Sequence, residues 1–229
     1  EWGVTVPYEN YDQKRIYVWF EAVIGYLSAS KEWAQKQGKP EAWRPFWESA
    51  DAKSYYFMGK DNVLFHAIIW PAMLMGYGGL NLPYDVPANE FLTLESNKIS
   101  TSRNWAVWLP DYLDRYQPDS LRYYLAVNMP ETGDSDFSWR SFVRRNNDEL
   151  VATYGNLVNR VLTFTYRSFD GNVPDPGELK SPSKIILGKA EQAVKDADQL
   201  LGRRRFKESI WVGLTLAQEA NRYIDAEAP

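Results

Sequence analysis

Two kinds of hydrophobic pattern divide the chain, and the change from one to the other falls near its middle. The first half contains three short runs of β-branched and aromatic residues, each predicting a buried strand, at 15–20, 54–58 and 90–94. Residues 21–37 are rich in helix formers and residues 62–75 are apolar almost all round, so both predict helices, the second bent by Pro71. Strands that alternate with helices indicate a parallel α/β sheet, and three strands make about half of one.

From residue 119 onward the pattern becomes helical. The expected helices cover 119–128, a long segment from a cap at Ser138 or Ser141 to Phe169, and then 183–201 and 203–226. An apolar stripe at helical spacing runs along the long segment and consists of Leu150, Tyr154, Leu157, Val161 and Phe164. We therefore expect an α/β fold followed by an all-α helical bundle.

The composition narrows the classes of function. Among its 229 residues the chain has no cysteine and one histidine, His66, which excludes disulfides and any site that needs thiolates or two histidines. The formal net charge of −4 argues against non-specific binding of DNA or RNA through bulk charge. The absence of cysteine makes a reducing compartment the default, so we expect a cytoplasmic protein. No run of ~18 apolar residues is long enough to span a bilayer, so we expect no membrane partner.

Both ends of the chain look cut. The sequence opens on Glu1-Trp2-Gly3, with neither an initiator Met nor an apolar signal segment, and it stops directly after a helical pattern. We therefore expect this chain to be a piece of a longer protein.

A short polar motif follows the second predicted strand. Gly59-Lys60-Asp61 lies between that strand and a helix start, where open α/β sheets bind ligands and helix amides attract anions. Asp61 can accept hydrogen bonds from a ribose, and Lys60 can meet a phosphate. The alternative is that Asp61 only caps the helix. Taken alone, the motif favours the capping interpretation.

A polar loop follows the third predicted strand. Residues 97–104 supply two cations, Lys98 and Arg103, and several hydroxyls, in a stretch without regular periodicity. Such a loop suits contact with a triphosphate, whose developing charge needs preorganised donors. Composition alone does not separate this hypothesis from an ordinary surface loop.

Aromatic residues gather on the first two strand–helix units. Trp19 ends a predicted strand, and His66 and Trp70 are spaced by four residues; together with Tyr26 they can wall a small apolar pocket. Core packing, with His66 hydrogen-bonded inside, explains the same pattern equally well.

Taken in order, these segments resemble class I aminoacyl-tRNA synthetases, and most closely the methionyl-tRNA synthetase family. Lys98-Ile99-Ser100-Thr101-Ser102 is similar to the Lys-Met-Ser-Lys-Ser signature loop of class I enzymes, with two changes. The other segments that resemble the family are 17–26, 59–73, 119–125 and 221–225. The resemblance spans nearly the whole chain.

The resemblance implies a domain organisation. Residues 1–94 would be the second half of a Rossmann-like nucleotide-binding catalytic domain. Residues 95–137 would hold the signature loop and a stem-contact segment, and residues 138–229 a truncated anticodon-binding helical bundle. The missing N-terminal half of the catalytic domain would then be a partner of this chain.

The resemblance also implies roles for individual residues. The methionine pocket would be lined by Trp19, Ala22, Tyr26, Asn62, His66 and Trp70. ATP would be bound by Lys60, Asp61, Lys98, Ser100, Thr101 and Ser102, with Lys98 and Thr101 acting in catalysis. The anticodon would be read by Asn156 and Arg160, which lie one turn apart on the long helix.

Three departures from the family pattern stand out. The His-x-Gly-His signature is absent because the chain has a single histidine. Thr101 stands where the family usually places a second lysine. Val23 and Asn62 stand where many relatives have Pro and Ile, so one wall of the pocket is more polar.

The leading hypothesis is a fragment of a methionine–tRNA ligase. The whole enzyme would activate methionine with ATP and Mg²⁺ and transfer it to tRNA(Met), whereas this chain alone would be inactive, and this portion would hold no zinc. Two alternatives stay open: a non-catalytic tRNA-binding module or half of a split synthetase, and a sister class I synthetase for another apolar amino acid. Trp19, Tyr26 and the Phe65-His66…Trp70 spacing favour methionine over the last of these.

Overall fold

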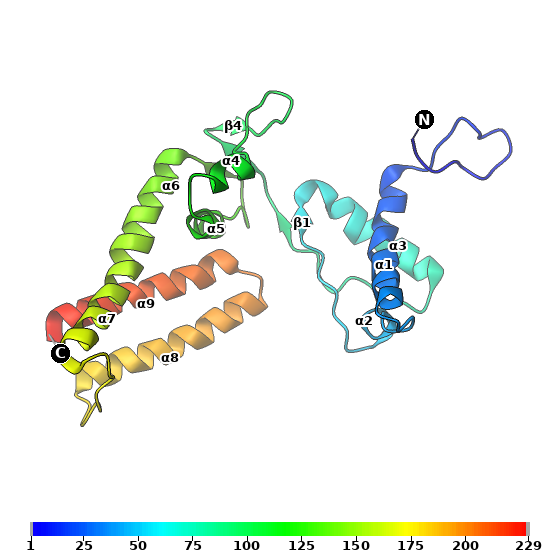
Figure 1. Ribbon diagram of the computed structural model, residues 1–229. Helices are drawn as coiled ribbons and strands as arrows, with labels where there is room; N and C mark the ends of the chain where they lie inside the picture. Colours follow the sequence, from blue (N-terminus) through cyan, green and yellow to red (C-terminus); the bar gives the residue numbers. More distant parts are fainter. Residues whose placement is uncertain (1, 228–229) are drawn as a thin grey trace. The chain divides into compact units, whose positions relative to one another are not determined.

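The computed structural model describes residues 2–227, and its contacts divide the chain into two compact units. The first unit runs over Glu1–Asn89 and the second over Glu90–Pro229. Figure 1 shows a mixture of helices and very short strands in the first, and a predominantly helical second unit.

The first unit is built on helix α1, Val18–Lys36, and on a helical segment that ends in α3, Trp70–Tyr77. The shorter elements are α2 (Arg44–Glu48), β1 (Met58–Gly59) and β2 (Ala88–Asn89). β1 and β2 pair in parallel, and a bridge between Tyr55 and Asp85 extends the same register. The core lies between the helices and consists of Val23, Leu27, Ala34, Trp43, Trp47, Tyr56, Trp70 and Leu74.

The strand predicted at 15–20 is wrong. The extended pairing is limited to an isolated bridge between Arg15 and Thr5, with the Ile16 N–H donating to the Val4 carbonyl at 2.8 Å, and the helix already begins at Val18. Val23 and Leu27, one turn apart, bury one face of the helix, with exposed fractions of 1% and 8%. Tertiary packing on that face outweighs the strand preference of the β-branched and aromatic residues at its start.

The helix predicted at 62–75 is present but irregular. It begins with a 3₁₀ turn at Lys60–Asn62, continues through a π-helical segment at Phe65–Ile69, and becomes α-helical only at Trp70. Pro71 occupies the first turn of α3, where its missing N–H costs least. The irregularity therefore precedes the proline.

In the second unit a three-stranded sheet carries the predicted polar loop. β3 (Leu92–Leu94) pairs antiparallel with β4 (Asn97–Lys98) and in parallel with β5 (Ser135–Phe137). The predicted three-stranded parallel sheet is therefore not formed by its predicted members, since β1 pairs with β2 and β3 with β4 and β5. Helices α4 (Leu109–Leu113) and α5 (Pro118–Val127) complete a core with Leu94, Tyr112, Leu121, Tyr124, Phe137 and Phe142.

The long helix expected from Ser138 to Phe169 is confirmed at both ends. Ser138 caps it, its Oγ accepting a hydrogen bond from the Ser141 N–H at 3.2 Å, and Asp170 ends it in a left-handed conformation. Its middle differs from the prediction, because α6 (Trp139–Arg145) and α7 (Asn156–Phe169) are joined by ten residues of π-helix, Asn146–Gly155.

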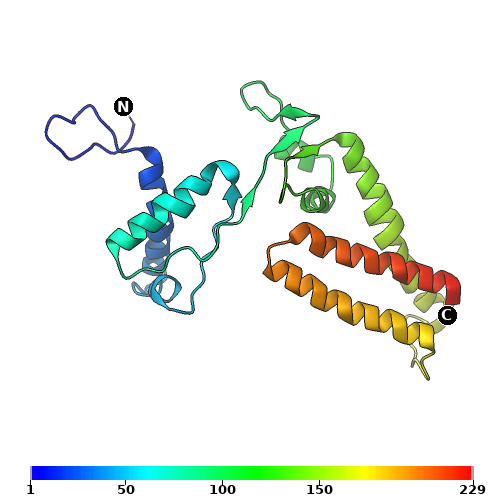
Figure 2. The same cartoon turned by 180° about the vertical axis from the view of Figure 1, so that it is seen from behind.

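The last two helices that the sequence predicts are both present, and they form an antiparallel pair. These are α8 (Ser181–Gly202) and α9 (Phe206–Glu227), which run side by side in Figures 1 and 2. A hydrogen bond of 2.9 Å between the hydroxyls of Ser183 and Tyr223 joins the start of α8 to the end of α9. α9 also packs on α5 and on the π-helical segment, and it buries Leu214 and Ala217.

Candidate functional site

The aromatic residues predicted to form a pocket come together in the first unit. The rings of Tyr26, His66 and Trp70 surround Tyr56, with centroid distances of 5.2 Å for Tyr26–Tyr56 and 5.8 Å for Tyr56–His66. Trp19 lies against a different partner, since its ring stacks on Phe65 at 4.8 Å. Tyr56 was not among the predicted pocket residues, and only its place in a run of β-prone residues indicated burial.

Hydrogen bonds fix the tautomer and the orientation of His66. Its Nδ1 lies 2.8 Å from the backbone oxygen of Asn62. A carbonyl oxygen can only accept a hydrogen bond, so Nδ1 is protonated and is the donor. In the neutral ring Nε2 then accepts from the Tyr26 hydroxyl at 2.8 Å. Both nitrogens are thus engaged, and the side chain is only 3% exposed.

The remaining members of the predicted pocket differ in burial. Trp70 belongs to the core, and its Nε1 donates to the Tyr56 hydroxyl at 3.0 Å. Burial raises the pKa of Tyr56, while that hydrogen bond from Trp70 acts in the opposite direction. Ala22 is exposed on α1, and Asn62 is half-buried at the end of the 3₁₀ turn. The geometry therefore combines a packed aromatic wall with a solvent-facing rim.

Lys60 and Asp61 lie where the sequence places them, directly after β1. Both belong to the 3₁₀ turn Lys60–Asn62, and Asp61 is exposed. No side-chain cap hydrogen bond is made at the start of this turn, and no hydrogen bond or ion pair engages the Asp61 carboxylate among residues 2–227. The carboxylate is thus available to a ligand, and the capping interpretation of Asp61 lacks a hydrogen bond to support it.

The polar loop is exposed and contains two successive turns. Glu95 and Ser96 turn the chain between β3 and β4 with φ of 47° and 62°. Beyond Lys98, the backbones of Ser100 and Trp105 exchange two hydrogen bonds of 2.9 Å, which close a turn over residues 101–104. Lys98, Thr101 and Ser102 are all exposed at this end.

Residues outside the motif hold this hairpin in place. The Asp136 carboxylate accepts from the Thr93 hydroxyl at 2.5 Å and from the Ser96 N–H at 2.7 Å. Trp105 donates from Nε1 to the Leu94 carbonyl at 3.0 Å. Within the loop, the hydroxyls of Ser100 and Ser102 lie 3.2 Å apart. Sequence reasoning missed Asp136 and Trp105, because their partners lie on other strands.

On the long helix, the two predicted anticodon readers both face α9. Asn156 donates from Nδ2 to the Asn221 side-chain oxygen at 3.3 Å, and Arg160 forms an ion pair of 2.6 Å with Asp225. Asn221 in turn donates to the backbone oxygen of Thr153 at 2.9 Å. The structure therefore brings Asn156 and Arg160 together on one face, and it adds two α9 residues as their partners.

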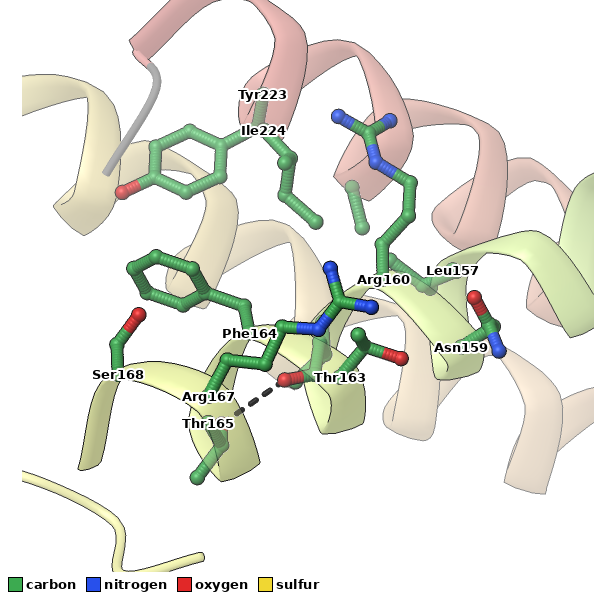
Figure 3. A pocket seen from close by; sticks show the side chains of 12 residues that line it. Leu157, Asn159, Arg160, Thr163, Phe164, Thr165, Arg167, Ser168, Tyr223 and Ile224 are labelled. Atoms are coloured by element: carbon green, nitrogen blue, oxygen red, sulfur yellow. Dashed lines mark hydrogen bonds between the residues drawn. The ribbon is translucent and has the colours of Figure 1, made fainter. Parts of the chain in front are cut away.

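Beside these residues, α7 and α9 enclose an open groove of about 880 Å³. Figure 3 shows the side chains that line it, with the guanidinium groups of Arg160 and Arg167 along the groove and the rings of Phe164 and Tyr223 toward one end. Sequence reasoning placed Phe164 in an apolar stripe, but it is 48% exposed. A half-exposed aromatic ring next to cations is a surface suited to planar, charged ligands.

Two further properties concern only the part of the chain that the structure describes. No helix there combines the length and apolar character needed to cross a membrane. Nor do those residues contain a group of three His, Asp or Glu side chains placed to hold a metal ion.

Comparison with known proteins gives one consistent answer. Residues 1–162 match the family described as class I tRNA synthetases (M). The methionine–tRNA ligase of Dehalococcoides mccartyi is 60% identical over 229 residues, covering 100% of this chain and 41% of that protein. The methionine–tRNA ligase of Thermomicrobium roseum is 54% identical over 230 residues, covering 100% and 39%.

Solved structures agree with these relatives. Methionyl-tRNA synthetase of Mycobacterium tuberculosis bound by methionyl-adenylate matches with a TM-score of 0.82 at 26% identity, covering 100% of this chain and 43% of that one. Its apo form matches with a TM-score of 0.79. The chain thus spans about two fifths of the length of the proteins it resembles, 39–43% in these four comparisons.

Proposed function

This chain belongs to the class I methionyl-tRNA synthetases, and from that premise we propose that it is part of a cytoplasmic methionine–tRNA ligase. The observation that carries the proposal is an identity of 60% that extends over all 229 residues. In the whole enzyme the methionine carboxylate attacks the α-phosphorus of ATP, and pyrophosphate leaves. The 3′-terminal ribose of tRNA(Met) then takes the methionyl group from the adenylate, and AMP is released.

We propose the same division of the chain that the resemblance implies. Residues 1–94, with β1 and β2, contribute to a Rossmann-like nucleotide-binding domain. Residues 95–137 supply the signature loop and a stem-contact segment, and residues 138–229 the anticodon-binding bundle. The remainder of the catalytic domain is supplied by sequence that the relatives have and this chain does not contain.

Methionine is proposed to bind against the aromatic wall of the first unit. Trp19, Tyr26 and Trp70 present rings that suit a thioether, because sulfur makes favourable contacts with aromatic edges and faces. Ala22 leaves room on α1, since it is exposed and has the smallest side chain of the set. The two hydrogen bonds of His66 support the wall by fixing Tyr26, and Asn62 contributes a polar edge.

The contacts to ATP are proposed to come from two exposed segments, one in the first unit and one in the second. In the first unit, Asp61 accepts hydrogen bonds from the ribose hydroxyls, with Lys60 beside it. In the second unit, Lys98 and the hydroxyls of Ser100, Thr101 and Ser102 stabilise the charge that develops on the triphosphate. Thr101 can donate a hydrogen bond but carries no charge, so Lys98 carries most of that stabilisation.

Mg²⁺ would enter with the nucleotide. A Mg²⁺ ion bound to a triphosphate keeps several waters and needs only one or two protein carboxylates. The described residues fit that mode rather than a protein cage, because they contain no cluster of three ligating side chains.

The bundle is proposed to bind the anticodon loop of tRNA(Met) through Asn156 and Arg160. An amide and a guanidinium are the groups that read the edges of unstacked bases in RNA loops. Because Asp225 already pairs with Arg160, RNA must displace or share this partner, which penalises a ligand that offers the guanidinium no equivalent acceptor.

Filter binding of an anticodon stem-loop RNA to the chain tests this proposal. We expect weak binding that requires the anticodon sequence, and a loss of about tenfold, or ~1.4 kcal/mol, in Arg160→Ala. Lys195→Ala removes one positive charge from the exposed side of α8 and serves as the matched control. Equal binding of a stem-loop with a scrambled anticodon, together with no loss in Arg160→Ala, would refute the anticodon-reading role.

A further inference from the structure

The groove between α7 and α9 continues well past the two proposed anticodon readers. Along α7, Phe164 lies one turn beyond Arg160, and Arg167 almost two turns beyond it. These offsets correspond to about 6 Å and about 10 Å along the helix axis. The same stretch of the groove is closed on the other side by Tyr223 and Ile224 of α9.

The charge of this stretch differs from that around Arg160. Arg160 is neutralised by Asp225, whereas no carboxylate among residues 2–227 forms an ion pair with Arg167. No acidic side chain is among the residues that line the groove. An uncompensated guanidinium in a chain of net charge −4 makes this stretch locally attractive to an anion.

The aromatic side chains of the groove are held by neighbours. Phe164 meets the ring of Phe169 edge-on, with centroids 5.8 Å apart and an interplanar angle of 78°. The Tyr223 hydroxyl is tied to Ser183 at 2.9 Å, so this ring is fixed from α8. Figure 3 shows the two rings at the same end of the groove, one from each helix.

We infer that Phe164 and Arg167 form a second nucleotide subsite for single-stranded RNA. The base of a loop nucleotide stacks on the exposed Phe164 ring, and the Arg167 guanidinium binds the adjoining phosphate. This subsite holds the neighbour of the nucleotide that Asn156 and Arg160 read, so the inference rests on the proposed tRNA-binding function. The cation and the ring supply sequence-tolerant affinity next to a sequence-reading pair.

Single-stranded RNA fits this groove better than other ligands, because the base matches the Phe164 ring and the phosphate matches the Arg167 guanidinium. An apolar ligand would use Phe164 and Tyr223 but would leave the Arg167 charge without a counterion. An isolated phosphate would use Arg167 but would gain nothing from the rings. A nucleotide satisfies the ring and the cation together.

Two variants of the full chain separate the two contacts in anticodon stem-loop binding. Arg167→Ala should weaken binding by about fivefold to tenfold and should lower the slope of log K against log salt by about 0.7, the value for one phosphate contact to a single strand. Phe164→Leu keeps an apolar side chain but removes the stacking surface, so binding should fall by about fivefold or more with an unchanged salt slope. Lys195→Ala should change neither quantity.

The folded state of each variant is checked by circular dichroism and urea unfolding before binding is compared. A stem-loop with 2-aminopurine placed at each loop position in turn reports stacking directly. One position should change fluorescence on binding to the unmodified chain and to Lys195→Ala but not to Phe164→Leu.

The outcomes distinguish this subsite from the anticodon readers. If Arg160→Ala and a scrambled anticodon weaken binding while Arg167→Ala and Phe164→Leu bind like the unmodified chain, the subsite is wrong and the proposed function survives. If no substitution and no change of anticodon affects binding, both fail. If inorganic phosphate alone displaces the stem-loop, and Phe164→Leu has no effect on stem-loop binding, the groove is only an anion site and the inference is overturned.

Discussion

His66 organises the aromatic wall of the first unit from a buried position. Its two ring nitrogens are committed to the Asn62 carbonyl and the Tyr26 hydroxyl, both at 2.8 Å. Tyr26 is itself 44% exposed, so the histidine links a buried core to a side chain that solvent or a ligand can reach. A buried acceptor that loses its donor costs free energy, and this gives the contact a measurable consequence.

Tyr26→Phe should destabilise the first unit by about 1 kcal/mol, because Nε2 of His66 loses its hydrogen bond while the ring packing is kept. Urea unfolding followed by circular dichroism measures the change. Tyr77→Phe provides a matched control on an exposed tyrosine of the same unit, outside this cluster. A free energy of unfolding equal to that of the unmodified chain would show that water replaces the hydroxyl without cost.

At this scale the sequence predicted some neighbours and missed others. The spacing of His66 and Trp70 by four residues is visible in the sequence, and the structure keeps both in the aromatic cluster. Tyr56 was missed because its contacts to Tyr26 and Trp70 join separate segments, which local periodicity does not encode. The candidate residues came from the resemblance to a family. The side chains that contact and orient them are visible only in the structure.

The long helix of the second unit carries an irregularity where several elements meet. Ten residues of π-helix separate α6 from α7, and the π-helical turn closes at Gly155, where an added Cβ would lie 3.0 Å from the Leu150 backbone oxygen. The same segment packs on α5, α7 and α9. Apolar spacing at 3.6 residues does not distinguish α from π, so the sequence predicted the helix and its ends but not this register change.

A half-buried polar contact joins α5 to that segment. Tyr123 of α5 donates to Glu149 Oε2 at 2.7 Å, and Arg145 binds the same carboxylate at 2.9 Å. Burial, followed by the hydrogen bond and the charge of Glu149, raises the pKa of Tyr123 above its ordinary value. The fold therefore favours the neutral phenol. The stability that the neutral Tyr123 phenol contributes is fully present below pH ~10, which is the pKa of a tyrosine in the unfolded chain. That stability is lost as the pH rises toward the higher pKa of Tyr123 in the folded chain.

Tyr123→Phe should lower the free energy of unfolding by about 1.5 kcal/mol at neutral pH, because a hydrogen bond to a carboxylate is lost. Above pH ~10 the variant should lose stability less steeply than the unmodified chain, since it has no phenol there to ionise. Urea unfolding at pH values from 7 to about 11 measures both effects. Tyr154→Phe, an exposed tyrosine on the π-helical segment, should follow the unmodified profile; parallel profiles for all three proteins would contradict the assignment.

For the molecule as a whole, the order of elements was more predictable than their pairing. The predicted helices of the second unit appear within a few residues of their expected bounds because they have amphipathic repeats and clear end signals, such as Ser138 and Asp170-Gly171. The five-residue helix α4 was not predicted, because it is too short to show such a repeat. The strands have only two or three residues, so neighbours rather than propensity decide them. β3 pairs with its neighbour β4 and also with β5, which lies more than 40 residues away, and no local pattern predicts the second pairing.

The chain alone should not catalyse methionine-dependent exchange of pyrophosphate into ATP. It contains a single histidine, so the His-x-Gly-His donors of the family are not available from its own sequence. His66 cannot substitute, because it is 3% exposed and both of its nitrogens already have partners. Losing one preorganised donor to a developing charge costs ~3 kcal/mol, and the loss of two should leave no exchange above background.

Incorporation of labelled pyrophosphate into ATP, with and without methionine, measures this directly. The full-length methionine–tRNA ligase of Dehalococcoides mccartyi, 60% identical over this region, is the positive control. The same preparation should still bind an anticodon stem-loop, because Asn156, Arg160 and their α9 partners all lie within the second unit. Methionine-dependent exchange by the chain at a rate near that of the control would mean that Lys98 and its loop suffice for activation, and that donors from outside this sequence are not required.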